Sequence, residues 1–127
     1  MEISFINVDL ELEGHESLQP IAEHFGESVS VLGCGAWGGY FQAAFEIAGG
    51  ASDPDSIINI FCTLINALGP REMKLWKNTF RREFNIGYES GLEPRSYESI
   101  IRSDTVSRIN AVGASIRITI YPPNSEQ

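Results

Sequence analysis

Alternation of apolar and polar side chains over residues 6–13 restricts the fold of this chain more than any other feature. The alternating residues are Ile6, Asn7, Val8, Asp9, Leu10, Glu11, Leu12 and Glu13. Successive side chains of a strand point to opposite faces, so this pattern predicts a strand with one buried face and one wet, acidic face. Strands are also expected at residues 29–32, 40–47, 82–88 and 115–121. Such strands suit a sheet that packs one face on a core and leaves the other in water.

A stripe of apolar residues at spacings of three and four predicts a central helix within residues 52–70. The stripe consists of Ile57, Ile58, Phe61, Leu64, Ile65 and Leu68. Asp53 suits the N-cap and Pro54 the first helical position. Gly69 is expected to take the left-handed turn that ends the helix.

Three shorter helices are expected, at residues 17–26, 71–80 and 104–113, with Ser17 and Asp104 capping the first and the last. Residues 91–101 fit a loop with a short edge strand. This mixture of one-sided strands and helices predicts a single two-layer α+β domain over residues 1–127. Its sheet would be mainly antiparallel with the helices packed on one face, and residues 124–127 would form a frayed tail.

The composition indicates a globular chain in the cytoplasm. The chain has 127 residues, 43% of them hydrophobic, which is enough for one core without a metal or disulfides. No apolar run reaches the roughly 20 residues of a membrane helix. Glu2 stands where a secretory signal would carry Lys or Arg. Two cysteines, Cys34 and Cys62, are too few for a disulfide framework.

Charge is divided unevenly along the chain, whose formal net charge is −8. Residues 1–70 hold ten acidic residues and no Lys or Arg, whereas residues 71–127 hold seven acidic and nine basic residues. An acidic half repels phosphate backbones, so direct nucleic-acid binding by it is not expected. Arg71, Lys74 and Lys77 follow the outer side of a predicted helix and fit a solvated face. The uneven division instead favours recognition of a basic protein partner.

Gly33–Gly38 matches the spacing G-x-G-x-x-G after a predicted strand. A dinucleotide site also needs a helix to begin there, and residues 40–47 alternate like a strand instead. The residues 33–39 are therefore interpreted as a glycine-rich hairpin loop. Within it, Trp37 either folds back on the core or anchors an interface, since tryptophan is enriched at interface hot spots.

No catalytic or metal-binding signature stands out, so neither an enzyme nor a cofactor is predicted. His15 and His24 have carboxylates beside them, but H-x-x-x-H and C-x-x-C spacings are absent. There is also no nucleophile elbow. Carboxylates such as Asp9 and Glu11 lie on the wet face of a predicted strand, which offers no pocket to raise a pKa.

One acidic group remains as the candidate binding surface. It comprises Asp9, Glu11, Glu13, Glu16, Glu23 and Glu27. Solubility and edge protection could explain it, but surfaces made for solubility normally mix both signs of charge. The missing Lys and Arg favour a protein-binding role, with Trp37 as the apolar anchor.

The C-terminal stretch Asp104–Tyr121, DTVSRINAVGASIRITIY, resembles the ending of a group of small bacterial domains. The shared pattern is a short helix, a small-Gly-small turn and an alternating strand closed by Tyr. The helix ending in Leu68-Gly69-Pro70 and the N-terminal strand are also similar. Small acidic proteins of this kind resemble immunity proteins of toxin–immunity systems, including contact-dependent growth inhibition. The resemblance implies binding a cognate toxin domain, often a nuclease, and blocking its active site.

The resemblance, taken with the uneven charge, implies an immunity protein that occludes a basic toxin domain by charge complementarity. Two alternatives stay open. One is a small enzyme or ligand-binding domain with a cleft near Gly33–Tyr40. The other is a dimerisation module joined through an exposed strand edge.

Overall fold

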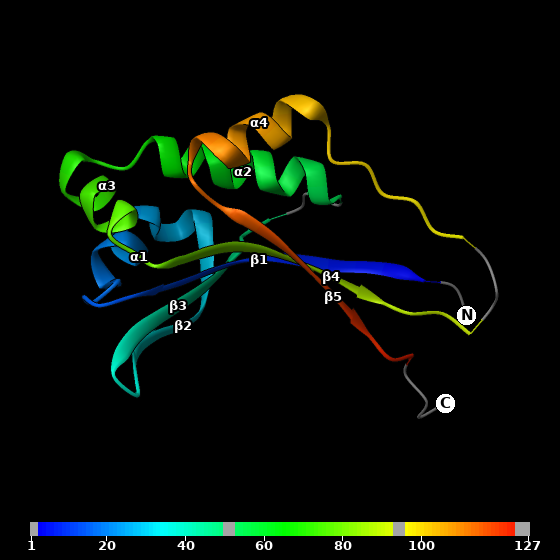
Figure 1. Ribbon diagram of the computed structural model, residues 1–127, viewed down its shortest axis with the longest axis horizontal. Helices are drawn as coiled ribbons and strands as arrows, with labels where there is room; N and C mark the ends of the chain where they lie inside the picture. The colour runs from blue at the N-terminus through cyan, green and yellow to red at the C-terminus, as the bar shows by residue number, and fades with distance from the viewer. Residues whose placement is uncertain (1–2, 50–52, 93–95, 124–127) are drawn as a thin grey trace.

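The chain folds into a single α+β domain, as the alternation predicts (Figure 1). The computed structural model describes residues 3–49, 53–92 and 96–123. Its strands are β1 (Ser4–Gly14), β2 (Val29–Trp37), β3 (Tyr40–Ile47), β4 (Arg81–Glu89) and β5 (Ser115–Tyr121). Its helices are α1 (Gln19–Phe25), the 3-10 turn η1 (Gly26–Ser28), α2 (Pro54–Asn66), α3 (Pro70–Lys77) and α4 (Ser103–Ala111). The predicted tail 124–127 and Glu2 lie outside the described residues.

The five strands form one mixed, mostly antiparallel sheet in the order β2-β3-β1-β4-β5. β1 occupies the centre and runs antiparallel to both β3 and β4. β2 and β3 form a hairpin at one edge. β5 pairs parallel with β4 at the other edge, and α4 lies in the connection, because a parallel pair needs a crossover.

The core fills the space between the sheet and the helices, which lie on one side of it (Figure 1). Leu10, Phe45 and Phe84 are fully buried on the sheet side, and Ile58 and Phe61 meet them from α2. The predicted stripe is confirmed, since Ile57, Ile58, Phe61 and Ile65 of α2 are buried and Leu64 packs partly buried against the core. Leu68 is also buried, just beyond the end of the helix. Trp76 of α3 is buried in the core, and its indole N–H donates to the Val112 carbonyl at 2.9 Å. The opposite face of the sheet carries no described helix.

The strand β1 begins earlier than predicted and contains an irregularity. Its pairing with β4 shifts between Phe5 and Asn7, which marks a bulge. Phe5 then packs against the core, whereas Ile6, predicted to point inward, is 48% exposed. The inward set from Val8 to Leu12 is confirmed.

The prediction of a loop at residues 33–39 is wrong. β2 continues through Gly33, Cys34 and Gly35 to Trp37, and only Gly38 and Gly39 form the turn. Pairing with Tyr40–Ala44 supplies the hydrogen bonds that hold this glycine-rich segment extended. Gly38 alone in this turn has a positive φ, of 62°, which explains a glycine there.

The central helix is confirmed with its N-cap, and its predicted end is wrong. Asp53 accepts the Ser56 backbone N–H at 2.9 Å. This bond and the Ser56 hydroxyl lower the pKa of Asp53. The helix ends at Asn66, and Gly69 has a φ of −70° as the N-cap of α3. Pro70 begins α3, where a proline suits the first helical position.

Four smaller predictions also need correction. α3 ends at Lys77, so Phe80 lies outside it. The N-cap of α4 is Arg102 and not Asp104. The N-cap of α1 is Leu18 and not Ser17, although the Ser17 hydroxyl accepts the Gln19 N–H at 3.3 Å. No strand forms in the described part of 91–101, whose residues 93–95 lie outside the described ranges.

Candidate functional site: the open face of the sheet

The face of the sheet opposite the helices, here called the open face, is the most distinctive surface of the fold. Strand alternation places on it Asn7, Asp9, Glu11 and Glu13 of β1, Gln42, Ala44 and Glu46 of β3, Arg81, Glu83 and Asn85 of β4, and Arg117 and Thr119 of β5. Most of these side chains are hydrogen-bonded to one another. The open face is therefore an ordered polar layer.

Arg81 is the centre of this layer. Its guanidinium binds Glu83 at 2.7 Å, Glu11 at 3.1 Å and Glu13 at 3.2 Å. Burial disfavours the charged guanidinium, but the hydrogen bonds with these three carboxylates outweigh it and raise the pKa of Arg81. Arg117 binds the same Glu83 at 2.8 Å and lowers the pKa of that carboxyl. Because Arg81 and Glu83 lie on β4 and the other carboxylates on β1, the cluster ties the two strands together.

Asp9 is the exception in this layer. It faces Glu46 on β3 and Asn85 on β4. Its Oδ1 atom is buried without a hydrogen-bond partner. Burial, followed by the neighbouring charges of Glu46 and Glu11, raises the pKa of Asp9 to about 6. The expectation that no acid on this face has a raised pKa is therefore wrong for Asp9.

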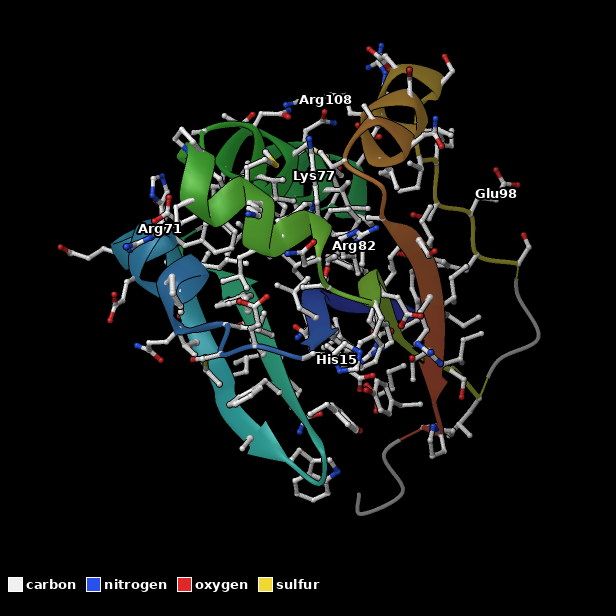
Figure 2. The ribbon with its side chains drawn as sticks, turned by 60° about the vertical axis from the view of Figure 1, so that its left-hand side comes forward. His15, Arg71, Lys77, Arg82, Glu98 and Arg108 are labelled. Atoms are coloured by element: carbon white, nitrogen blue, oxygen red, sulfur yellow. The ribbon has the colours of Figure 1, made fainter. Side chains whose placement is uncertain are left out.

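Aromatic side chains gather at the hairpin end of the open face. Trp37 is 62% exposed and pairs with Tyr40 across the β2–β3 turn. Tyr40 contacts the ring of Phe80 edge-on at a centroid distance of 5.7 Å, and the His15 ring lies 4.9 Å from the same ring. Figure 2 shows His15 beside the sheet, away from the helices. Of the two alternatives for Trp37, burial in the core is excluded.

Only part of the predicted acidic group lies on the open face. Asp9, Glu11, Glu13 and Trp37 share it. Glu16 is exposed in the turn after β1, Glu23 lies on α1 and Glu27 in η1, so these three do not join the row on β1. Sequence reasoning did not assign His15, Tyr40 or Phe80 to the candidate binding surface, although it considered His15 as a metal ligand and Tyr40 as part of a cleft. They come from three separate segments, and no sequence signal brings them together.

A shallow hollow of about 460 Å³ lies between β2 and the Arg81 cluster. Its floor is made by residues with little or no side chain: Gly33, Gly35, Ala43 and Ala44. Glu11, Gln42 and Arg81 stand at its sides. The hollow exists because β2 and β3 carry small residues where β1 and β4 carry long ones. It includes the first part of the segment Gly33–Tyr40, through residues 33–36, but none of residues 37–40 lines it.

The basic residues around α3 do not form one surface. Arg71 is 86% exposed and faces away from the sheet (Figure 2). Arg81 points into the open face, whereas Arg82, next along β4, points to the helix side. There Arg82 donates to the carbonyls of Gly113 at 2.9 Å and Thr79 at 2.8 Å. Arg81 therefore lies on the opposite face of the sheet from Arg82, its neighbour in sequence.

The described residues contain no cluster of three or more His, Cys, Asp or Glu side chains placed to hold a metal ion. His24 instead contacts the Ala67 carbonyl through Nε2 at 3.0 Å. The Gly33–Gly38 motif leads from β2 into β3, so no helix N-terminus follows it to receive a pyrophosphate. None of the described helices combines the length and apolar character needed to cross a membrane.

Comparison with known proteins finds no matching family model, curated protein or solved structure.

Proposed function

We propose that this chain is a non-enzymatic binding protein of the immunity type, acting in the cytoplasm, which docks a basic toxin domain on its open face. The observation that carries the proposal is an exposed aromatic group beside ordered carboxylates on a sheet face without a described helix. Trp37 is 62% exposed and Phe80 51% exposed. Partly exposed aromatics with charged neighbours are typical of interface anchors.

The charge of the open face supports a basic partner. Five carboxylates lie on its central part, Asp9, Glu11, Glu13, Glu46 and Glu83, against two guanidinium groups, Arg81 and Arg117. Arg81 neutralises part of this charge, but it also holds Glu11 and Glu13 in fixed positions. Fixed carboxylates lose less side-chain entropy when a partner's Lys or Arg binds. Glu16, Glu23 and Glu27 then act on the partner only at longer range.

The direct experiment is co-purification with a basic nuclease toxin domain, followed by a nuclease-protection assay. Trp37→Ala should weaken binding by about tenfold or more, the loss expected for an interface anchor. Ile100→Ala is a matched control, because Ile100 is 74% exposed and lies in the segment before α4, outside the open face. Its affinity should stay within about twofold of the unmodified chain. Equal affinities of the two variants would contradict docking at the hairpin end.

The hollow beside Gly33 and Gly35 favours a second candidate function, the binding of a small ligand. Its volume of about 460 Å³ falls within the range of ligand pockets, and Glu11, Gln42 and Arg81 supply polar groups at its sides. A crystallographic fragment soak would test it. Fragments that occupy the hollow in the unmodified chain, and not after Gly35→Val, would favour this function over docking of a protein.

A further inference from the structure

Asp9 lies in the middle of the central strand, and its buried Oδ1 atom has no hydrogen-bond partner. Its register neighbours are Glu46 on β3 and Asn85 on β4. β2 adds only Ser30, which pairs with Glu46, and no described helix packs against this face. The charged groups nearest to Asp9 are therefore the carboxylates Glu46 and Glu11, with Arg81 and Glu83 beyond them.

The side-chain donors on the strands beside Asp9 are already directed to other acceptors. The Asn7 amide donates to Glu46 at 2.8 Å, and the Asn85 amide donates to Glu11 at 3.0 Å. Arg81 donates to Glu11, Glu13 and Glu83. The Oδ1 atom of Asp9 is consequently buried without a partner. A buried carboxylate oxygen without a hydrogen-bond donor raises the free energy of the folded chain. Binding a proton removes the negative charge and with it most of this penalty.

We propose that Asp9 carries a proton in the folded chain under mildly acidic conditions and shares it with Glu46 across the β1–β3 pair. The Cβ atoms of directly opposed strand residues lie about 4.5–5.5 Å apart, within reach of a hydrogen bond between two carboxyl groups. The shared proton supplies the donor that Asp9 lacks and removes a like-charge pair. The charge at the centre of the open face then depends on pH.

The sign of the effect on stability follows from linkage. The pKa of Asp9 rises from its ordinary value of 3.8 to about 6 in the folded chain. Between these values the folded chain binds a proton that the unfolded chain has lost, so the fold gains stability as pH falls. The gain is complete below about pH 4 and is lost as pH rises through about 6.

The test combines carboxyl carbon NMR with denaturation. In the unmodified chain, the side-chain carboxyl carbon of Asp9 should titrate near pH 6, and the urea midpoint should be higher at pH 5 than at pH 7.5. In Asp9→Asn this difference should shrink, whereas it should persist in Glu23→Gln, which alters an exposed acid on α1. An Asp9 midpoint below about pH 4.5 would overturn the proposal, and this measurement does not require any variant to fold.

Glu46→Gln tests whether Glu46 contributes to holding the proton on Asp9. If Glu46 takes part, removing its charge should move the Asp9 midpoint down by a readily measured fraction of a pH unit. An unchanged midpoint would mean that burial alone holds the proton and would overturn the sharing. Neither measurement uses a toxin, so these outcomes are independent of the proposed docking function.

Discussion

The Arg82 side chain donates hydrogen bonds to backbone carbonyls at or just after the C-terminal ends of two helices. Its guanidinium donates to the carbonyls of Trp76 at 3.2 Å, Thr79 at 2.8 Å and Gly113 at 2.9 Å. These carbonyls follow or close α3 and α4, where a helix leaves its last carbonyls without internal partners. The positive charge also complements the negative ends of both helix dipoles. Arg82 is therefore a structural residue.

Replacing Arg82 by Met should lower the free energy of unfolding by about 2 kcal/mol, because two partly buried carbonyls and one exposed carbonyl lose a charged donor. Urea denaturation at neutral pH measures the loss. Arg71→Met is the matched control, since Arg71 is 86% exposed and should change stability by less than about 0.5 kcal/mol. Similar losses in the two variants would show that Arg82 does not support the helix ends.

At the scale of elements, β2 is unusual because glycines occupy two central positions of an edge strand. At Gly33 and Gly35, the position that a Cβ atom would occupy has no other atom within 4 Å, and neither residue has a positive φ. An added methyl group would therefore meet open space. The absence of side chains at these positions produces the hollow on the open face. The backbone conformation itself does not require glycine there.

Gly33→Ala and Gly35→Ala should each raise the free energy of unfolding by about 0.5–1 kcal/mol, because alanine loses less backbone entropy on folding. Gly38→Ala provides the contrast. Gly38 has a φ of 62° in the β2–β3 turn, so alanine there should destabilise the chain. Urea denaturation of the three variants measures the effects. A loss of stability in Gly35→Ala would contradict the inference that its surroundings are open.

For the whole molecule, the distribution of charge decides how fast a basic partner can associate. The acidic N-terminal half supplies most of the carboxylates on the open face, and the C-terminal half supplies Arg81 and Arg117 to the same face. The two halves thus partly neutralise each other where they meet. Steering of a partner depends on the charge that remains.

Reversal of Glu11 and Glu13 to Lys should slow association with a basic toxin domain, and Arg81→Gln should speed it by removing a positive charge from the same cluster. Stopped-flow measurements at low and high salt would show both effects, which should converge as salt screens the charges. Thermal unfolding of each variant checks that the fold survives, because all three residues belong to one ion-pair cluster. Rates that stay equal at low salt would contradict steering by this face.

The sequence predicted the elements with strong periodicity and could not predict their partners. Alternation identified β1 and β3, and the stripe with its Asp53 cap identified α2. The predicted β2 ends too early because glycines favour turns, whereas in the structure pairing with β3 holds Gly33 and Gly35 extended. The parallel pairing of β5 is not encoded in its alternation. Asp9, Glu11, Glu13 and Trp37 were assigned to a candidate binding surface, but the contact of Arg81 with Glu11 spans 70 positions and has no local signal.

The Arg81 cluster also protects the alignment of the sheet. Its carboxylate partners on β1, Glu11 and Glu13, lie two positions apart, on the side away from the helices. A slip of β1 by a single position would turn both carboxylates toward the apolar interior and Leu10 and Leu12 toward water. A misaligned sheet would lose these ion pairs and bury carboxylates without partners, so the cluster favours the observed register.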